Sequence, residues 1–252
     1  MLLQKILLFL IIISSSLISV SQVVNIESYR KKTDTVGWAG SAEATLFINK
    51  NNDFVLALNT NIELQYKTKK TLWLMLTDLA TVRANNDQRF VNGGFQHFRF
   101  NYKITDRFVL EAFIQGQFSE PLGINWRYLA GAGPRLKVFG GDEFRLYVAA
   151  AYMSEWEETT EVMKGTQYNR MSSYISFTYT PNDNVFIAST TYYQPRLDVW
   201  NDYRVSENLN IRTDITDKIY FIFDYTLLYD TRPPIGITTT AYILKSGFGL
   251  EF

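Results

Sequence analysis

The 252-residue chain carries 25 basic and 25 acidic side chains, no Cys and a single His, and 15% of its residues are aromatic. The balanced charge offers no basic field for nucleic acid, and the missing Cys excludes both a disulfide framework and a Cys/His metal site. No segment beyond the N-terminal region approaches the ~20 unbroken apolar residues that a membrane-spanning helix needs. We therefore expect no bound cofactor and no helical membrane protein.

The N-terminal region has the layout of a secretory signal peptide. One positive charge, Lys5, precedes an apolar run over residues 6–13, and small residues stand at Ser19 and Ser21. The apolar run is short for an anchor helix and is followed directly by three serines, so cleavage before Gln22 is favoured. Residues 1–21 are thus predicted to be a signal peptide, and residues 22–35 a short periplasmic lead-in.

From Val36 onward, apolar and polar residues alternate in long segments separated by turn residues. The clearest segment, residues 54–67, places Phe54, Leu56 and Leu58 on one face and Asn59 and Asn61 on the other. Ordinary globular strands have about five or six residues. About thirteen residues at ~3.3 Å each span roughly 43 Å, which is enough to cross a hydrocarbon layer with tilt.

About twelve such strands are predicted. They cover residues 36–49, 54–67, 71–83, 92–103, 107–119, 126–139, 144–157, 169–180, 185–194, 203–213, 218–229 and 238–252. Connections after even-numbered segments are short, and those after odd-numbered segments are mostly long, with residues 50–53 as the exception. This asymmetry and the even count are typical of outer-membrane barrels, with short turns on the periplasmic side. The predicted fold is an all-β, transmembrane, antiparallel up-and-down β-barrel over residues 36–252.

Apolar and polar residues also alternate along the strands of a soluble β-sandwich or a lipocalin-like barrel, but the apolar face of these folds is buried in a protein core. Here aromatic residues gather near the ends of the apolar face, where a membrane–water boundary would lie. They include Trp38, Tyr66, Phe100, Tyr102, Tyr179 and Tyr229. We therefore favour the transmembrane barrel over the soluble alternatives.

The final segment is expected to close the barrel on the first strand. One side carries Tyr242, Leu244, Phe248 and Phe252, while Lys245 and Glu251 lie on the other. A register slip of one residue would turn both charges toward lipid. We also expect the barrel-assembly machinery to recognise this strand through its terminal aromatic residue.

Several stretches resemble the salt-induced outer-membrane protein family, a YdiY-like group of unknown function. The stretches are GWAGS at 37–41, YKTKK at 66–70, NGGFQHFRFNYKITDRFVLEAFIQGQ from 92, RYLAGAGPRLKVF from 127, YYQP at 192–195 and YDTRPP at 229–234. The resemblance implies a barrel in the outer membrane of a Gram-negative bacterium, surrounded by outer-membrane lipid and lipopolysaccharide. It provides no catalytic residues to transfer.

If the apolar side faces lipid, ionisable residues line the lumen. The candidates are Glu43, Glu63, His97, Arg99, Glu111, Arg127, Arg135, Arg145, Glu155, Arg170, Asp224 and Lys245. They could select solutes along a pore or pair with one another across a packed interior. Isolated charges in a narrow interior are unfavourable, so we favour a packed network, with a narrow channel as the alternative.

His97 is the one candidate for acid–base catalysis. An outer-membrane hydrolase would pair a His with a nucleophilic Ser or with carboxylates. Its neighbour on the same strand face is Arg99, which is a poor partner for a base. A structural histidine is favoured, and an enzyme using His97 with lumen or rim carboxylates stays as the alternative.

The acidic stretch Glu155, Glu157, Glu158 and Glu161 could hold divalent cations beside lipopolysaccharide. Its spacing is irregular for a metal site, so we interpret it as a solvated outer loop. The leading functional expectation is a structural or passive barrel, or a narrow channel of the cell envelope, and not an enzyme. A protein that binds partners through its long loops is a further alternative.

Overall fold

The computed structural model describes residues 36–50, 54–84, 88–160, 165–216 and 218–250. The predicted signal peptide, the lead-in, Glu161 and Phe252 lie outside the described residues. Within the described ranges, no helix combines the length and apolar character needed to cross a membrane.

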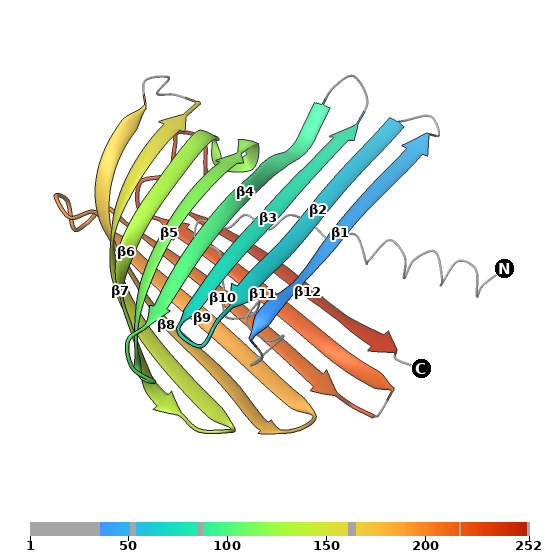
Figure 1. Cartoon of the computed structure of the whole chain (residues 1–252). Coiled ribbons are helices and arrows are strands. Elements are labelled where there is room, and N and C mark those ends of the chain that lie inside the picture. Colours follow the sequence, from blue (N-terminus) through green and yellow to red (C-terminus); the bar gives the residue numbers. More distant parts are fainter. Residues whose placement is uncertain (1–35, 51–53, 85–87, 161–164, 217, 251–252) are drawn as a thin grey trace.

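The described chain forms one sheet of twelve antiparallel strands, each hydrogen-bonded to its neighbours in sequence order (Figure 1). The strands are β1 (Gly37–Lys50), β2 (Phe54–Lys67), β3 (Thr71–Ala84), β4 (Gln88–Lys103), β5 (Phe108–Ser119), β6 (Ile124–Gly140), β7 (Phe144–Thr159), β8 (Thr166–Asn182), β9 (Val185–Pro195), β10 (Tyr203–Asp214), β11 (Ile219–Asp230) and β12 (Thr240–Leu250), with a short 3₁₀ turn η2 (Glu120–Leu122). The prediction of an all-β, up-and-down architecture with twelve strands is confirmed.

Several strands extend beyond their predicted limits. β4 begins at Gln88 rather than at residue 92, because pairing with β3 continues to Ala84↔Gln88 after a register shift between Val82 and Arg83. The shift interrupts the alternation of side chains without ending the backbone ladder. The predicted long connection over residues 84–91 is therefore mostly strand.

The sheet rolls so that β1 to β4 lie in front of β9 to β12, with β6 and β7 at the bend (Figure 1). The pairing runs from β1 to β12, and no ladder between these two edge strands is described. The predicted closure of the last strand on the first is therefore not part of the described sheet.

Small residues allow the bend at β6. A Cβ on Gly133 would lie 2.1 Å from the carbonyl oxygen of Ala150, so no larger residue fits there without moving the backbone. Above the inner surface of β6 and β7, the Tyr174 hydroxyl of β8 donates a hydrogen bond of 2.7 Å to Glu111 of β5. On a flat sheet, strands three places apart would be separated by ~14 Å. The contact therefore depends on the curvature.

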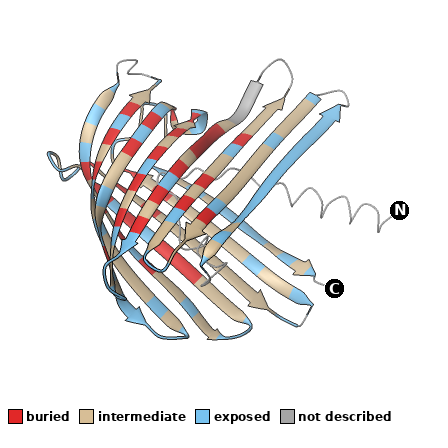
Figure 2. Ribbon diagram, in the orientation of Figure 1, coloured by how far each residue is buried: buried red, intermediate tan, exposed pale blue. Residues whose placement is uncertain are grey.

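The two faces of the rolled sheet differ in chemistry. On β3 and β4, Leu74 and Arg99 point inward and are buried, while their neighbours Trp73 and Phe98 point outward and are exposed. Figure 2 shows the buried residues spread over the central strands, with β1 almost entirely exposed. Apolar side chains thus cover the outside, whereas the inside combines charged and polar residues with a smaller apolar set that includes Leu74, Leu76 and Phe113, unlike the predominantly apolar core of a water-soluble sandwich.

Candidate functional site: the charged inner face

All twelve predicted lumen residues lie on the inner face by their cross-strand register. Their surroundings divide them into two groups. The buried group consists of His97, Arg99, Glu111, Arg127, Arg135, Glu155 and Arg170. The more accessible group consists of Glu43, Glu63, Arg145, Asp224 and Lys245.

Glu155 of β7 is the centre of the buried group. It has no exposed surface, and guanidinium groups surround its carboxylate. Arg170 Nε lies 2.8 Å from Oε2, Arg127 Nε lies 3.3 Å from Oε1, and Arg204 Nη1 also contacts Oε1. A buried carboxylate with this many charge-assisted partners is held in a single geometry.

Further carboxylates balance these arginines. Glu157 accepts hydrogen bonds from Arg127 Nε at 2.6 Å and from Arg204 Nη2 at 3.0 Å, and Asp230 lies 2.7 Å from Arg204 Nε. Asp202 in the connection before β10 lies 3.1 Å from Arg170 Nη2. We call Arg127, Arg170, Arg204, Glu155, Glu157, Asp202 and Asp230 the arginine cluster.

The arginine cluster closes the interior at the end of the strands where the long connections lie. The connection between β11 and β12 lies beside it, because Pro234 and Ile237 pack against Gly123 and line one cavity together with Arg127 and Asp230. Gly123 has a φ of 65°, which favours glycine at this point. A cavity of only about 20 Å³ remains beside Arg127, which is room for about one water molecule.

The cluster continues outward through Arg196, which lies after β9. Its Nη1 is 3.0 Å from Asp202, and its Nη2 is 2.6 Å from Asp198. The hydrogen bond from Arg196 lowers the pKa of the Asp198 carboxyl, and in return Asp198 raises the pKa of Arg196. The exposed rim of the network is therefore ionised at neutral pH.

A second, smaller network is centred on Glu111 of β5. Arg99 Nη1 lies 3.1 Å from Glu111 Oε2, and Arg135 Nε lies 3.8 Å from Oε1. The Arg135 guanidinium also lies 3.8 Å from the ring centre of Tyr147, a favourable cation–π distance. Together with the Tyr174 hydroxyl, these groups connect β4, β5, β6, β7 and β8 across the bend.

His97 is fully buried next to this second network. Its Nδ1 lies 2.8 Å from Gln115 Oε1, and its ring stacks on Phe113 with centroids 5.8 Å apart. Within the described ranges, its Nε2 has no hydrogen-bond partner. Catalysis would need a nucleophile or a carboxylate within hydrogen-bond reach of the ring, and no such contact is described. The site supports a packing role for His97.

The accessible group lies near the two sheet edges or at strand ends. Ser41 Oγ lies 3.4 Å from Glu63, and Asn210 donates a hydrogen bond to Asp224. Lys245 of β12 is paired in register with Asp224. These charges have neighbours on fewer sides than those of the arginine cluster.

The interpretation of the acidic stretch as a solvated loop is wrong for its first two residues. Glu155 and Glu157 belong to β7, which is consistent with the predicted strand over residues 144–157, and they point inward and are buried among guanidinium groups. Glu158 has the opposite phase and lies 3.4 Å from the Asn125 amide. Among the described residues, no group of three or more His, Cys, Asp or Glu has a metal-binding arrangement.

The sequence predictions missed Asp202, Arg204 and Asp230. For Arg204 a signal was available, since it shares the phase of Ser206 and Asn208 on the polar face of an alternating strand. Glu207 was missed as well. It stands in the outward phase between Val205 and Leu209, and accepts a hydrogen bond of 2.7 Å from Ser189.

The chain is similar to known proteins in sequence family and in fold. Residues 42–252 match the family model described as "Protein of unknown function, DUF481". The chain belongs to the DUF481 family. No curated protein matches the chain.

Two solved structures are similar to this DUF481 member. One is described as "NanC porin structure in rhombohedral crystal form", with 11% identity, a TM-score of 0.48, and coverage of 85% of this chain and 98% of that one. The other is described as "Unveiling the Mechanism Behind the in-meso Crystallization of Membrane Proteins", with 13% identity, a TM-score of 0.37, and coverage of 86% and 83%. Both TM-scores lie below 0.5, so neither similarity supports a function for the family member described here.

Proposed function

We propose that this protein is an outer-membrane β-barrel with an occluded interior, serving a structural or passive role in the cell envelope. The observation that carries the proposal is the inverted distribution of side chains. Outward residues such as Ile175 and Phe248 are 56% and 74% exposed, whereas Arg127 and Glu155 inside are 2% and 0% exposed. Hydrocarbon around the sheet accounts for the first pair, and mutual ion pairing accounts for the second.

A membrane location also requires the two sheet edges to pair. Unpaired backbone N–H and C=O groups cost several kcal/mol each in lipid, so spanning sheets are closed. β1 and β12 point in opposite directions in an up-and-down sheet of twelve strands, and they have 14 and 11 residues. We propose that they form the closing antiparallel ladder in the membrane.

This closure can be tested by cysteine cross-linking in a chain that has no native Cys. Ala44→Cys on the outer face of β1 would be combined in turn with Tyr242→Cys, Leu244→Cys and Ser246→Cys on β12. One register should give efficient disulfide formation in native outer membranes, and the others should not. If none of the three cysteine pairs forms a disulfide, the proposed closure is wrong.

The occluded interior predicts weak conduction. In planar bilayers the protein should give little steady conductance, because the arginine cluster and the β11–β12 connection fill one end. Heat-modifiable migration on detergent gels should confirm that the same preparation is a folded barrel. Large, reproducible open-channel currents from that preparation would contradict the occluded barrel.

A narrow channel is the second candidate, and the accessible group of inner charges favours it. Glu43, Glu63, Asp224 and Lys245 would line the interior beside the closing strands. Small cation-selective currents that respond to Glu43→Gln would support this alternative. A loop-mediated binding role has no contact in the described structure that favours it.

The proposal extends to the lipids and the assembly machinery that the barrel would contact in the envelope. The motifs that resemble the salt-induced outer-membrane group support the same placement. Outer-membrane lipid and lipopolysaccharide would contact the apolar outside, and the assembly machinery would recognise the last strand. We further propose that the protein is not an enzyme, so that His97→Asn should leave every envelope phenotype of the wild-type protein unchanged.

A further inference from the structure

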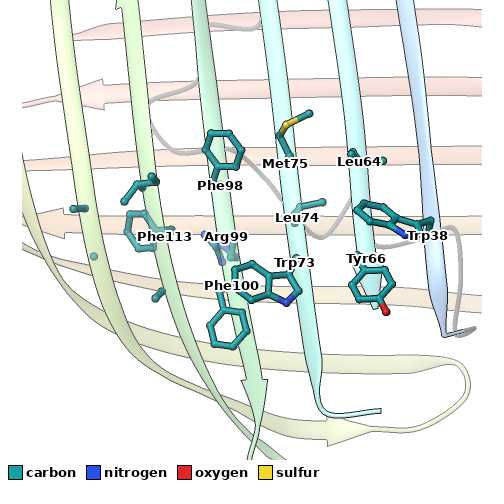
Figure 3. Close-up of a pocket in the computed structure, with 14 residues that line it drawn as sticks. Trp38, Leu64, Tyr66, Trp73, Leu74, Met75, Phe98, Arg99, Phe100 and Phe113 are labelled. Carbon is teal, nitrogen blue, oxygen red and sulfur yellow. The ribbon is translucent and has the colours of Figure 1, made fainter. Parts of the chain in front are cut away.

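An apolar groove of about 810 Å³ lies on the outer face of β1 to β6 (Figure 3). One register row across the first four strands consists of aromatic residues: Trp38, Tyr66, Trp73 and Phe100. The Trp38 and Tyr66 rings are 4.8 Å apart, and the Trp73 and Phe100 rings are 4.4 Å apart. This volume is in the range of sites that hold an organic ligand.

The groove arises because the aromatic row stops abruptly. In the same row, β5 contributes Ala112, and in the next row β6 contributes Ala130. The rings therefore line the groove together with the two alanines, and Ile114 of β5 lies in the next row between Phe98 and Ala130. In Figure 3 the rings of Phe98, Phe100 and Trp73 lie on the side away from the opposite wall of the sheet.

A basic turn lies directly beyond the aromatic end of the groove. Lys69 and Lys70 are exposed in the connection between β2 and β3, three residues or fewer from Tyr66 and Trp73. The Thr68 hydroxyl accepts hydrogen bonds from the backbone N–H of Lys70 at 3.2 Å and of Thr71 at 2.9 Å, which fixes the turn. At ~3.3 Å per residue, the backbone of each lysine lies within roughly 10 Å of the backbone of the nearest aromatic residue of the row.

The charge of this turn distinguishes it from the other short turns. The connection between β6 and β7 contains Asp142 and Glu143, and that between β8 and β9 contains Asp183. In the neighbouring turn, Lys103 is neutralised by Asp106 at 2.5 Å. Within the described chain, no ion pair is found for Lys69 or Lys70. An apolar groove that ends at two such cations complements an acyl chain that ends at a phosphate.

We propose that the groove and the basic turn bind one anionic diacyl phospholipid. Its acyl chains lie against Trp73, Phe100 and Ala112, and its phosphodiester contacts Lys69 and Lys70. A second copy of the chain is a poorer occupant, because two-fold pairing over this face would bring the two basic turns toward each other. The inference rests on the proposed membrane location and adds a specific lipid in the leaflet on the side of the short turns.

The test uses the full mature protein, folded in detergent and offered equal amounts of phosphatidylglycerol and phosphatidylcholine. Native mass spectrometry should show retention of one phosphatidylglycerol in preference to phosphatidylcholine. The double variant Lys69→Glu, Lys70→Glu should lose this preference, and Lys218→Glu in another short turn serves as the matched control. Ala112→Phe should fill the groove and reduce the retention of both lipids.

Equal retention of the two lipids by the wild-type protein would overturn the proposal and indicate ordinary surrounding lipid only. An unchanged preference in the Lys69, Lys70 double variant would overturn it as well. Heat-modifiable migration of each preparation separates this failure from failure of the proposed function. A protein that shows the folded-barrel shift and yet retains no lipid refutes the lipid site alone.

Discussion

The inner face of the sheet has two halves with the same alternating sequence pattern, but their charged side chains differ in burial and in the number of ion-pair partners. In the arginine cluster, Glu155 meets guanidinium groups from β6, β8 and β10 and is completely buried. Near the sheet edge, Glu43 of β1 has the same inward phase and is exposed, and β1 is paired in the described sheet with β2 on one side alone. Figure 2 shows β1 as mostly exposed. The comparison shows that burial of an inward charge depends on how many strands curve around it.

The largest loss of stability is expected for a substitution within the arginine cluster. Glu155→Gln leaves three guanidinium groups around a neutral amide, and uncompensated buried charge typically costs about 3–5 kcal/mol. Urea unfolding in lipid vesicles, followed by Trp fluorescence, measures this loss of stability.

Glu43→Gln is the matched control in the accessible half. It should change the free energy of unfolding by less than about 0.5 kcal/mol, as surface substitutions usually do. Equal effects of the two variants would show that the two halves do not differ in the membrane.

A smaller loss of stability is expected when the hydrogen bond between β8 and β5 across the bend is removed. Tyr174→Phe removes the hydroxyl that donates to Glu111, and a hydrogen bond to a charged group contributes about 1.5–3 kcal/mol. Tyr242→Phe on the outer face of β12 is the control, since that side chain is 69% exposed and should tolerate the change. If unfolding shows no difference between the two variants, the contact across the bend does not stabilise the curvature.

The smallest effect concerns the exposed rim of the arginine cluster. Because the pKa of Asp198 is lowered in the folded protein, its contribution is present above the ordinary carboxyl value of 3.8 and is lost as the pH falls through the folded pKa. Solvent screens this exposed pair, so the contribution is small, and Asp198→Asn should leave the free energy of unfolding at neutral pH unchanged within error. Loss of stability comparable to that of Glu155→Gln would contradict the division into a buried core and a solvated rim.

Much of the fold and part of the site could be predicted from the chain. The alternation in β2 and β12 assigned each side chain to a face, since successive residues of a strand point in opposite directions. Alternation failed where a register shift disturbed the phase at the start of β4, and Glu157 was interpreted as a loop residue although the same alternation places it on the inner face of β7. Asp202 follows no strand pattern at all, because it reaches the arginine cluster from a connection.

Period-two patterning is a local property, so the sequence was enough to predict the strand order, the inner and outer faces and most of the charged residues on the inner face. The tertiary structure alone decided which inward charges meet. Glu155 and Arg204 are 49 residues apart, and Glu111 and Tyr174 are 63 residues apart. Their contacts depend on the curvature of the sheet, and at Gly133 a backbone carbonyl of β7 approaches too closely for any larger side chain. That curvature is a property of the whole rolled sheet, and it separates the buried network from the charges that remain at the edges.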